Sequence, residues 1–186
     1  GTCTNPTAIL DQPYQFDFYD GGGLDQAFLG LAECDRFGNI NVSRFGPKIA
    51  GCGGFINITQ TAPVVVYCGT FTAGGLKVEV KDGQLHILQE GRIKKFIKDV
   101  EQVTFGAAYA KETGQKVLYI TERAVFELLD GVLTLTEIAP GVDLEKDIMA
   151  HMEFRPAVSE NLKEMDASIF RDEIMGLLEE KEEKAV

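Results

Sequence analysis

The chain has 186 residues, of which 45% are hydrophobic and 25% charged, and its net charge of −11 corresponds to a pI near 4.6. This length accommodates one large domain with a substantial core, and the composition is that of an ordinary globular protein. The acidic balance argues against nucleic acid, which requires a clustered positive surface. No apolar run reaches the roughly 18 residues of a membrane span, and no signal peptide opens the chain, so a cytoplasmic location is expected.

The cysteines and histidines do not have the spacing of a metal site. No CxxC pair occurs, and the two histidines lie far apart in the sequence. The ligands of structural zinc sites are spaced more closely in the sequence, so no metal is expected. The cysteines are interpreted as reduced, mostly buried thiols. These residues are Cys3, Cys34, Cys52, Cys68, His86 and His151.

Short apolar runs between glycine clusters fill the first sixty residues, a pattern typical of strand ends and active-site loops. Asp25, directly after Gly21 to Gly23, is expected to cap a helix over the apolar run 27–32. The β-branched run Val64 to Val66, bounded by proline and glycine, predicts a buried strand in a parallel sheet.

Two Asp-Gly pairs predict antiparallel hairpins in the middle of the chain. Apolar and polar residues alternate over 77–88 around Asp82-Gly83, and again over 117–139 around Asp130-Gly131. The glycine tolerates the positive φ of a type I′ turn. The predicted fold is therefore α/β, with a mixed, largely parallel open sheet, flanking helices and antiparallel hairpins.

Helices are predicted after Pro140-Gly141. Asp143 is expected to cap a helix over 143–152, with acidic residues in its first turn. Ser159 is expected to cap a final helix over 160–178, where apolar residues recur at helical spacing. The charged tail 179–186 is expected to fray.

The sharpest local motif is Gly51-Cys52-Gly53-Gly54. Closely spaced glycines let backbone N–H groups approach a ligand and stabilise a developing oxyanion. The alternative interpretation is a tight turn that connects strands. The motif matches neither of the glycine-rich nucleotide-binding fingerprints.

The order of several motifs resembles the bacterial acetate/propionate (short-chain acyl-CoA:carboxylate) CoA-transferases. They run from FDFYDGGGLD through GPKIAGCGGFINI, VVVYCGTFTAGG and EGRIKKF to ITERAVFEL and TLTEIAPGVDLEKDI. The resemblance extends from about Asn5 to about Met175. It implies that residues 1–186 form the carboxy-terminal part of a CoA-transferase catalytic domain whose amino-terminal half lies elsewhere.

The resemblance also implies a mechanism. In the family a glutamate attacks the acyl-CoA thioester, and ping-pong exchange proceeds through a glutamyl-CoA thioester. By similarity, Gly53 and Gly54 would form the oxyanion hole. Glu122 would orient the nucleophile or hold substrate, with an exposed acid paired to Arg123 as the alternative. Acyl-CoA and a short-chain carboxylate would be substrates, no cofactor would be needed, and a homo-oligomer is expected.

The coenzyme A site carries three further candidates by similarity. Gly51, Lys48 and Lys77 match or lie near positions that bind CoA in relatives. Lysines on exposed hairpins are also commonly just solvated, and the stem of Lys48 can cover apolar surface.

No glutamate in this chain matches the family's nucleophile. Glu33 and Glu90 both lie in segments that the family matches elsewhere. A truncation, a proteolytic product or a natural split subunit would each account for this. A non-catalytic acyl-CoA-binding or assembly subunit is the alternative function, and sugar-phosphate isomerisation on the same layout is a more distant one.

Overall fold

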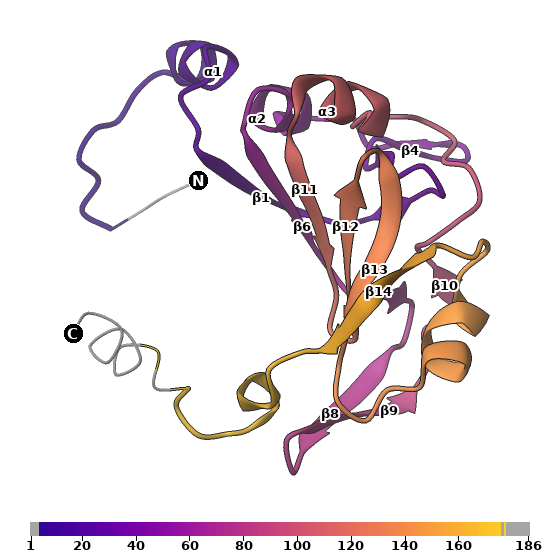
Figure 1. Cartoon of the computed structure of the whole chain (residues 1–186). Helices are drawn as coiled ribbons and strands as arrows, with labels where there is room; N and C mark the ends of the chain where they lie inside the picture. Colours follow the sequence, from indigo (N-terminus) through magenta and orange to yellow (C-terminus); the bar gives the residue numbers. More distant parts are fainter. Residues whose placement is uncertain (1–3, 176, 178–186) are drawn as a thin grey trace.

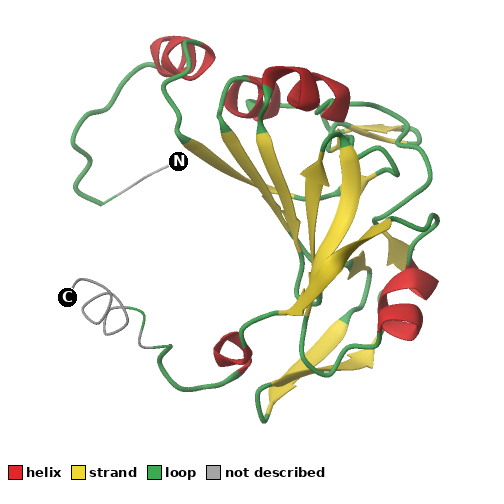
Figure 2. Cartoon of the chain, in the orientation of Figure 1, coloured by secondary structure: helices red, strands yellow, loops and turns green. Residues whose placement is uncertain are grey.

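A computed structural model describes residues 4–175 and 177, and a six-stranded mixed sheet forms its centre (Figures 1 and 2). The first three strands run parallel, the next two pairings are antiparallel, and the last strand is parallel to its neighbour. The predicted α/β class with a mixed sheet is therefore confirmed. In spatial order the strands are β1 (Gln26–Gly30), β6 (Val64–Cys68), β11 (Lys116–Ile120), β12 (Ala124–Leu129), β13 (Val132–Ile138) and β14 (Ala157–Glu164).

Two short helices cover one face of the parallel strands. Helix α2 (Phe55–Gln60) connects β1 to β6, and α3 (Ala107–Thr113) connects β6 to β11. The ring of Phe55 stacks on Tyr67 at a centroid distance of 5.7 Å. Because parallel crossovers are right-handed and both steps move the same way across the sheet, both helices lie on the same face.

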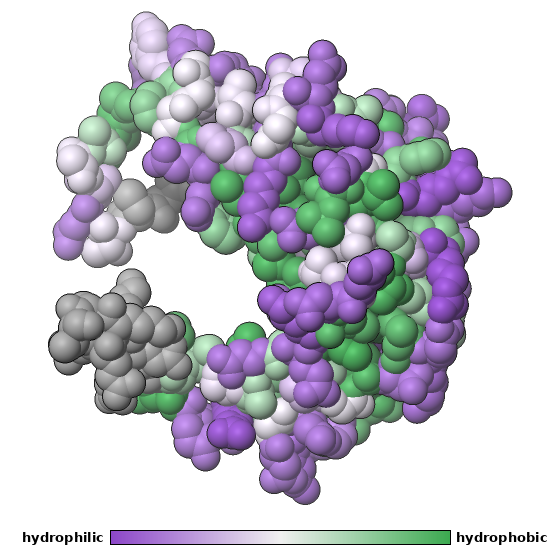
Figure 3. All heavy atoms as spheres, viewed as in Figure 1, coloured by the Kyte–Doolittle hydropathy of each residue, from purple (hydrophilic) through white to green (hydrophobic). Residues whose placement is uncertain are grey.

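The opposite face of these strands is apolar and is exposed at the outer strand β1. Strand register places Phe28, Val66 and Leu118 side by side on it; Phe28 is 67% exposed and Leu118 partly exposed, whereas Val66 is buried. The space-filling view shows a recess bordered by hydrophobic side chains (Figure 3). Parallel sheets are ordinarily covered on both faces, so this face lacks a layer in the described part of the chain.

Both predicted hairpins are confirmed. Strands β8 (Lys77–Lys81) and β9 (Gln84–Gln89) meet at Asp82-Gly83, where φ is 53° and 74°. Strands β12 and β13 meet at Asp130-Gly131, where φ is 51° and 80°. These positive φ angles are those of the type I′ turn, which glycine and aspartate tolerate.

Short strand pairs form the loops between the main strands. They are β2 (Glu33–Cys34) with β3 (Ile40–Asn41), β4 (Arg44–Phe45) with β5 (Lys48–Ile49), and β7 (Thr72–Ala73) with β10 (Ile93–Lys94). Of the cysteines in the described residues, Cys34 is buried, whereas Cys52 and Cys68 are exposed. The expectation of mostly buried thiols is therefore wrong for the latter two.

The helix expected after Asp25 is wrong. The run that follows Asp25 is β1, which pairs with β6 over its whole length. A helix, α1 (Gln12–Asp20), instead precedes the glycines. Gly23 packs so closely on Phe18 that an added Cβ would lie 2.3 Å from the ring. A short apolar run has no decisive periodicity, and pairing in the sheet decides its conformation.

The carboxy-terminal elements differ from the prediction. Asp143 caps a helix as expected, accepting hydrogen bonds from the N–H groups of Glu145 and Lys146. That helix is a π turn, η1 (Leu144–Ile148), followed by a 3₁₀ turn, η2 (Met149–His151).

The helix predicted to begin at Ser159 is wrong. Residues 157–164 form β14, and a 3₁₀ turn, η3 (Ala167–Phe170), follows it. Pairing with β13 and burial of Met165 override the helical spacing of the apolar residues. The end of that prediction and the charged tail 179–186 lie outside the described residues. No helix in the described ranges is long and apolar enough to cross a membrane.

Candidate functional site

The carboxyl ends of β1, β6 and β11 meet at one edge of the sheet. The N–H of Leu31 donates to the carbonyl of Cys68, and the N–H of Gly69 donates to the carbonyl of Ile120. The residues that follow β1 and β6 are therefore hydrogen-bonded to the ends of the neighbouring strands. In open α/β sheets, ligands bind in the crevice outside the carboxyl ends of parallel strands. This edge is therefore where a functional site is expected.

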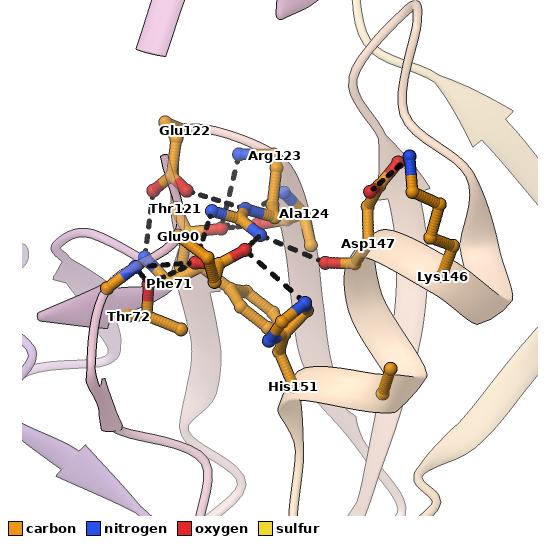
Figure 4. A network of polar contacts seen from close by, with 12 residues as sticks. Phe71, Thr72, Glu90, Thr121, Glu122, Arg123, Ala124, Lys146, Asp147 and His151 are labelled. Carbon is orange, nitrogen blue, oxygen red and sulfur yellow. Dashed lines mark hydrogen bonds and ion pairs between the residues drawn. The ribbon is translucent and has the colours of Figure 1, made fainter. Parts of the chain in front are cut away.

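Glu122 lies just beyond β11 at this edge (Figure 4). Its Oε2 accepts from the N–H of Phe71 at 2.8 Å, and its Oε1 accepts from Nε of Arg123 at 2.7 Å. The side chain is 17% exposed. The predicted pairing with Arg123 is present, but Glu122 is not the exposed acid of that interpretation. Both carboxylate oxygens are engaged within the protein, and one of them holds the loop after β6.

Arg123 is the centre of a network that the sequence did not reveal. Its side chain is fully buried, and Nη1 lies 2.6 Å from Oε2 of Glu90 and 3.0 Å from the carbonyl oxygen of Asp147. Its guanidinium also lies 5.0 Å from the Phe71 ring centroid. Burial disfavours the charged form, but hydrogen bonds and charge from Glu90 and Glu122 outweigh it, so the pKa of Arg123 is raised.

Glu90 joins the same network from the end of β9. It accepts from the Thr72 hydroxyl and from the N–H of Gly91, and Nε2 of His151 lies 3.5 Å from it. Partial burial raises the pKa of Glu90. Hydrogen bonds from Arg123 and Thr72 lower it by more, so the net shift is downward. The network therefore ties the loop after β6, the end of β9 and the η1 turn to the sheet edge.

The lowered pKa of Glu90 predicts a pH-dependent contribution to stability. A carboxyl whose folded-state pKa lies below its ordinary 4.5 stabilises the protein above that value, and this contribution is lost as pH falls through the folded-state pKa. We expect Glu90→Gln to destabilise the protein most at neutral pH and progressively less below pH 4.5. Urea unfolding of both proteins across this range measures the difference. A constant difference at all pH values would contradict the prediction.

The glycine motif connects β5 to α2 and is exposed up to Gly53. Gly51 and Gly53 have φ of 79° and 53°, and neither would meet an atom within 4 Å if it carried a Cβ. Gly51 and Cys52 border a cavity of about 290 Å³. The motif is thus a turn, as one interpretation proposed, but it leads from a strand into a helix and lies open beside a hollow.

The beginning of α2 lies close to the sheet edge described above. Phe55, which follows Gly54, lines a second hollow of about 490 Å³ together with Gly30 and Leu31. Within the described residues, no acceptor in the chain binds the N–H groups of Gly53 or Gly54. These two donors are available to an external oxygen.

The other predicted site residues are not gathered there. Lys48 lies on the exposed β4–β5 hairpin and Lys77 at the exposed start of β8. Among the described residues, no side-chain hydrogen bond or ion pair joins either lysine to Glu122 or to the glycine motif. In the same residues, no group of three metal-ligating side chains comes together.

The fold matches that of a solved acyl-CoA transferase. The crystal structure of the acyl-CoA transferase YdiF from Escherichia coli O157:H7, a thioester complex with CoA, matches 95% of this chain with a TM-score of 0.91 at 53% identity. The match covers 35% of that structure's chain.

Two relatives support the same family. Acetate CoA-transferase YdiF of Escherichia coli (strain K12) is 53% identical over 178 residues, which are 96% of this chain and 34% of that protein. Caffeate CoA-transferase of Acetobacterium woodii is 53% identical over 182 residues, 95% of this chain and 34% of that protein. No protein-family profile matches the sequence. The chain is therefore similar over nearly its whole length to CoA-transferases, and it spans about one third of the length of these relatives.

Proposed function

We propose that this chain is the carboxy-terminal part of an acyl-CoA:short-chain carboxylate CoA-transferase. The observation that carries the proposal is the 53% identity to an acetate CoA-transferase across 96% of the chain. The reaction would proceed by ping-pong exchange through a glutamyl-CoA thioester, with a glutamate supplied from outside these 186 residues. CoA is a substrate here, and no cofactor or metal enters the proposal.

The chemistry requires a group that holds negative charge at the reacting carbonyl. The glutamate carboxylate attacks the thioester carbonyl, the C–S bond breaks, and CoA leaves as a thiolate from the tetrahedral intermediate. CoA then attacks the anhydride to give the glutamyl thioester and release the acid. Gly53 is exposed and Gly54 partly exposed, and no acceptor among the described residues pairs with their N–H groups, which supports their assignment to the oxyanion hole.

Lys48, Lys77 and Gly51 are proposed to contact CoA. Both lysines are exposed, and Gly51 borders the cavity of about 290 Å³ beside the glycine motif. Ammonium groups on exposed hairpins can meet the phosphates of a large carrier without prior desolvation. Binding energy from these remote parts of CoA would then serve the reacting centre.

The partner is proposed to be the remaining part of the polypeptide seen in the relatives. Phe28 and Leu118 flank the buried Val66 in an apolar row whose outer member, Phe28, is exposed, and parallel sheets are ordinarily covered on both faces. Segments from the remaining part would supply this layer and the nucleophilic glutamate together. A homo-oligomer of the assembled protein is also proposed. The free thiols of Cys34, Cys52 and Cys68 fit the reducing cytoplasm.

The alternative function is a non-catalytic acyl-CoA-binding or assembly subunit. It is favoured by one observation, which is that no glutamate of this chain matches the family nucleophile. Glu90 in particular is bound by Arg123 and is not free to attack a thioester. Calorimetry with CoA separates a binding subunit from a scaffold.

The proposed function predicts a conditional activity. We expect no CoA-transferase turnover from the chain alone, because its nucleophile is missing. Co-production with the remaining part of a relative, which carries the glutamate, should restore acetate-dependent exchange of CoA. Turnover by the chain alone would overturn the mechanism. A stable complex without turnover would favour the non-catalytic alternative.

A further inference from the structure

Lys95 places its ammonium group at the carboxyl edge of the parallel strands. If Gly69 carried a Cβ, that atom would lie 2.8 Å from Nζ of Lys95 and 2.9 Å from the carbonyl oxygen of Leu31. Gly69 follows β6 and Leu31 follows β1. The absence of a side chain at Gly69 therefore makes room for Nζ between the ends of two strands.

This ammonium group has no partner in the described part of the chain. Lys95 is 7% exposed, yet its Nζ makes no hydrogen bond and no ion pair there. Glu122 contributes a favourable charge, but its two oxygens already accept from Phe71 and Arg123. Burial lowers the pKa of Lys95, and the charge of Glu122 opposes this effect. The side chain is largely buried, but Nζ itself is not one of the fully buried polar atoms that lack a partner, so an acceptor from outside the chain can reach it at the edge.

The backbone holds Lys95 firmly in this position. Its carbonyl accepts from the N–H of Cys34 at 2.8 Å, and the next residue, Phe96, is fully buried and bridges to Cys34. The neighbouring Lys94 points elsewhere and donates to the carbonyls of Ala150 and Met152. The orientation of Lys95 toward the edge is thus set by the packing of its own segment.

We propose that Nζ of Lys95 binds a carboxylate at the ends of β1 and β6. The proposal rests on the proposed CoA-transferase function and adds a substrate-binding or positioning residue to it. A carboxylate suits a recessed single ammonium, because one oxygen can accept from it while the rest of the group stays at the edge. The carboxylate comes either from the free acid substrate or from the glutamate of the remaining part.

The recessed position argues against a CoA phosphate as the ligand. Lys48 and Lys77 are exposed and can reach phosphates, whereas Lys95 is nearly buried. The carbonyl oxygen of Leu31 lies beside Gly69, as Nζ of Lys95 does, and Leu31 also lines the hollow of about 490 Å³ together with Phe55. The carboxylate site would therefore lie near the glycine motif, where the oxyanion develops.

The test uses the assembled enzyme with Lys95→Met, Lys95→Arg and the matched control Lys98→Met. Lys98 is exposed on the same segment. If the ligand is the free acid, Lys95→Met raises the KM for acetate by about 10- to 100-fold and leaves glutamyl-CoA formation unchanged. If the ligand is the glutamate, Lys95→Met slows glutamyl-CoA formation by a similar factor, measured by intact mass, with the KM for acetate unchanged. Lys95→Arg retains part of either effect, and Lys98→Met shows neither.

A folded Lys95→Met enzyme with normal KM and normal glutamyl-CoA formation would overturn the proposal while leaving the transferase function intact. If the variant does not fold, an acetate titration of the wild-type assembled enzyme, followed by NMR of the lysine side chains, decides the free-acid case. The glutamyl-CoA form of the same enzyme, whose nucleophilic glutamate has no free carboxylate, decides the case in which that glutamate is the ligand. Signals of Lys95 that stay fixed in both would overturn the proposal. An inactive wild-type enzyme whose Lys95 signal still responds to acetate would instead count against the proposed function alone.

Discussion

Replacement of Arg123 by methionine is expected to lower the free energy of unfolding by about 3 kcal/mol, near the low end for breaking a buried ion pair. The guanidinium is fully buried and bonds to both Glu90 and Glu122. Methionine fills the space of the stem but deprives two part-buried carboxylates of the guanidinium that bonds to both. Urea unfolding of the chain measures the loss.

The companion variants separate charge from packing. Adding Glu90→Gln and Glu122→Gln to Arg123→Met should recover part of the loss, because the uncompensated carboxylates are then gone. Arg155→Met is the matched control, since Arg155 pairs with Glu145 on the exposed surface and its loss should change stability little. A loss in Arg123→Met no larger than in Arg155→Met would show that the network does not stabilise the fold.

The second large effect is expected on turnover, from removal of one backbone donor at Gly54. Proline at this position has no N–H, and its preferred φ lies close to the −86° of Gly54. Loss of one oxyanion donor lowers kcat by about 10²- to 10³-fold. We therefore expect the assembled Gly54→Pro enzyme to lose that factor in acetate-dependent CoA exchange.

Gly54→Ala is the matched control for this substitution. A Cβ at Gly54 would lie 2.5 Å from the ring of Phe16, and both variants introduce this Cβ. Only the proline variant lacks the N–H. With equal melting temperatures, the ratio of the two kcat values isolates the donor. Equal kcat values in the two variants would remove Gly54 from the oxyanion hole and leave Gly53 as the remaining candidate.

Local signals in the sequence predicted several elements correctly. Asp82-Gly83 and Asp130-Gly131 both form the hairpin turns expected of them, and Val64 to Val66 form a buried parallel strand. Asp143 caps the helix that follows it. In each case the cause lies within a few residues, either in a backbone conformation that few residues tolerate or in a side chain that bonds to its neighbours.

The failures occurred where distant pairing decided the outcome. The run after Asp25 and the segment after Ser159 both joined the sheet, because β6 and β13 offered unpaired edges. Helical spacing within one segment carries no information about an edge that another segment provides. Helix α1 was missed because its aromatic residues are spread around the helix and do not form one apolar stripe.

The sequence by itself predicted the α/β class and the two Asp-Gly hairpins, showed the resemblance to CoA-transferases and singled out the glycine motif as a candidate site. Only the tertiary structure decided how the charges are used. Glu90 and Arg123 are separated by 33 residues yet form a bidentate pair, whereas Lys95 has no acceptor among the residues that the structure describes. The sequence does not distinguish a charged side chain that is solvated from one that is paired or one that binds a ligand. Its state depends on which distant residues fold against it, because burial and the position of the opposite charge set its energy.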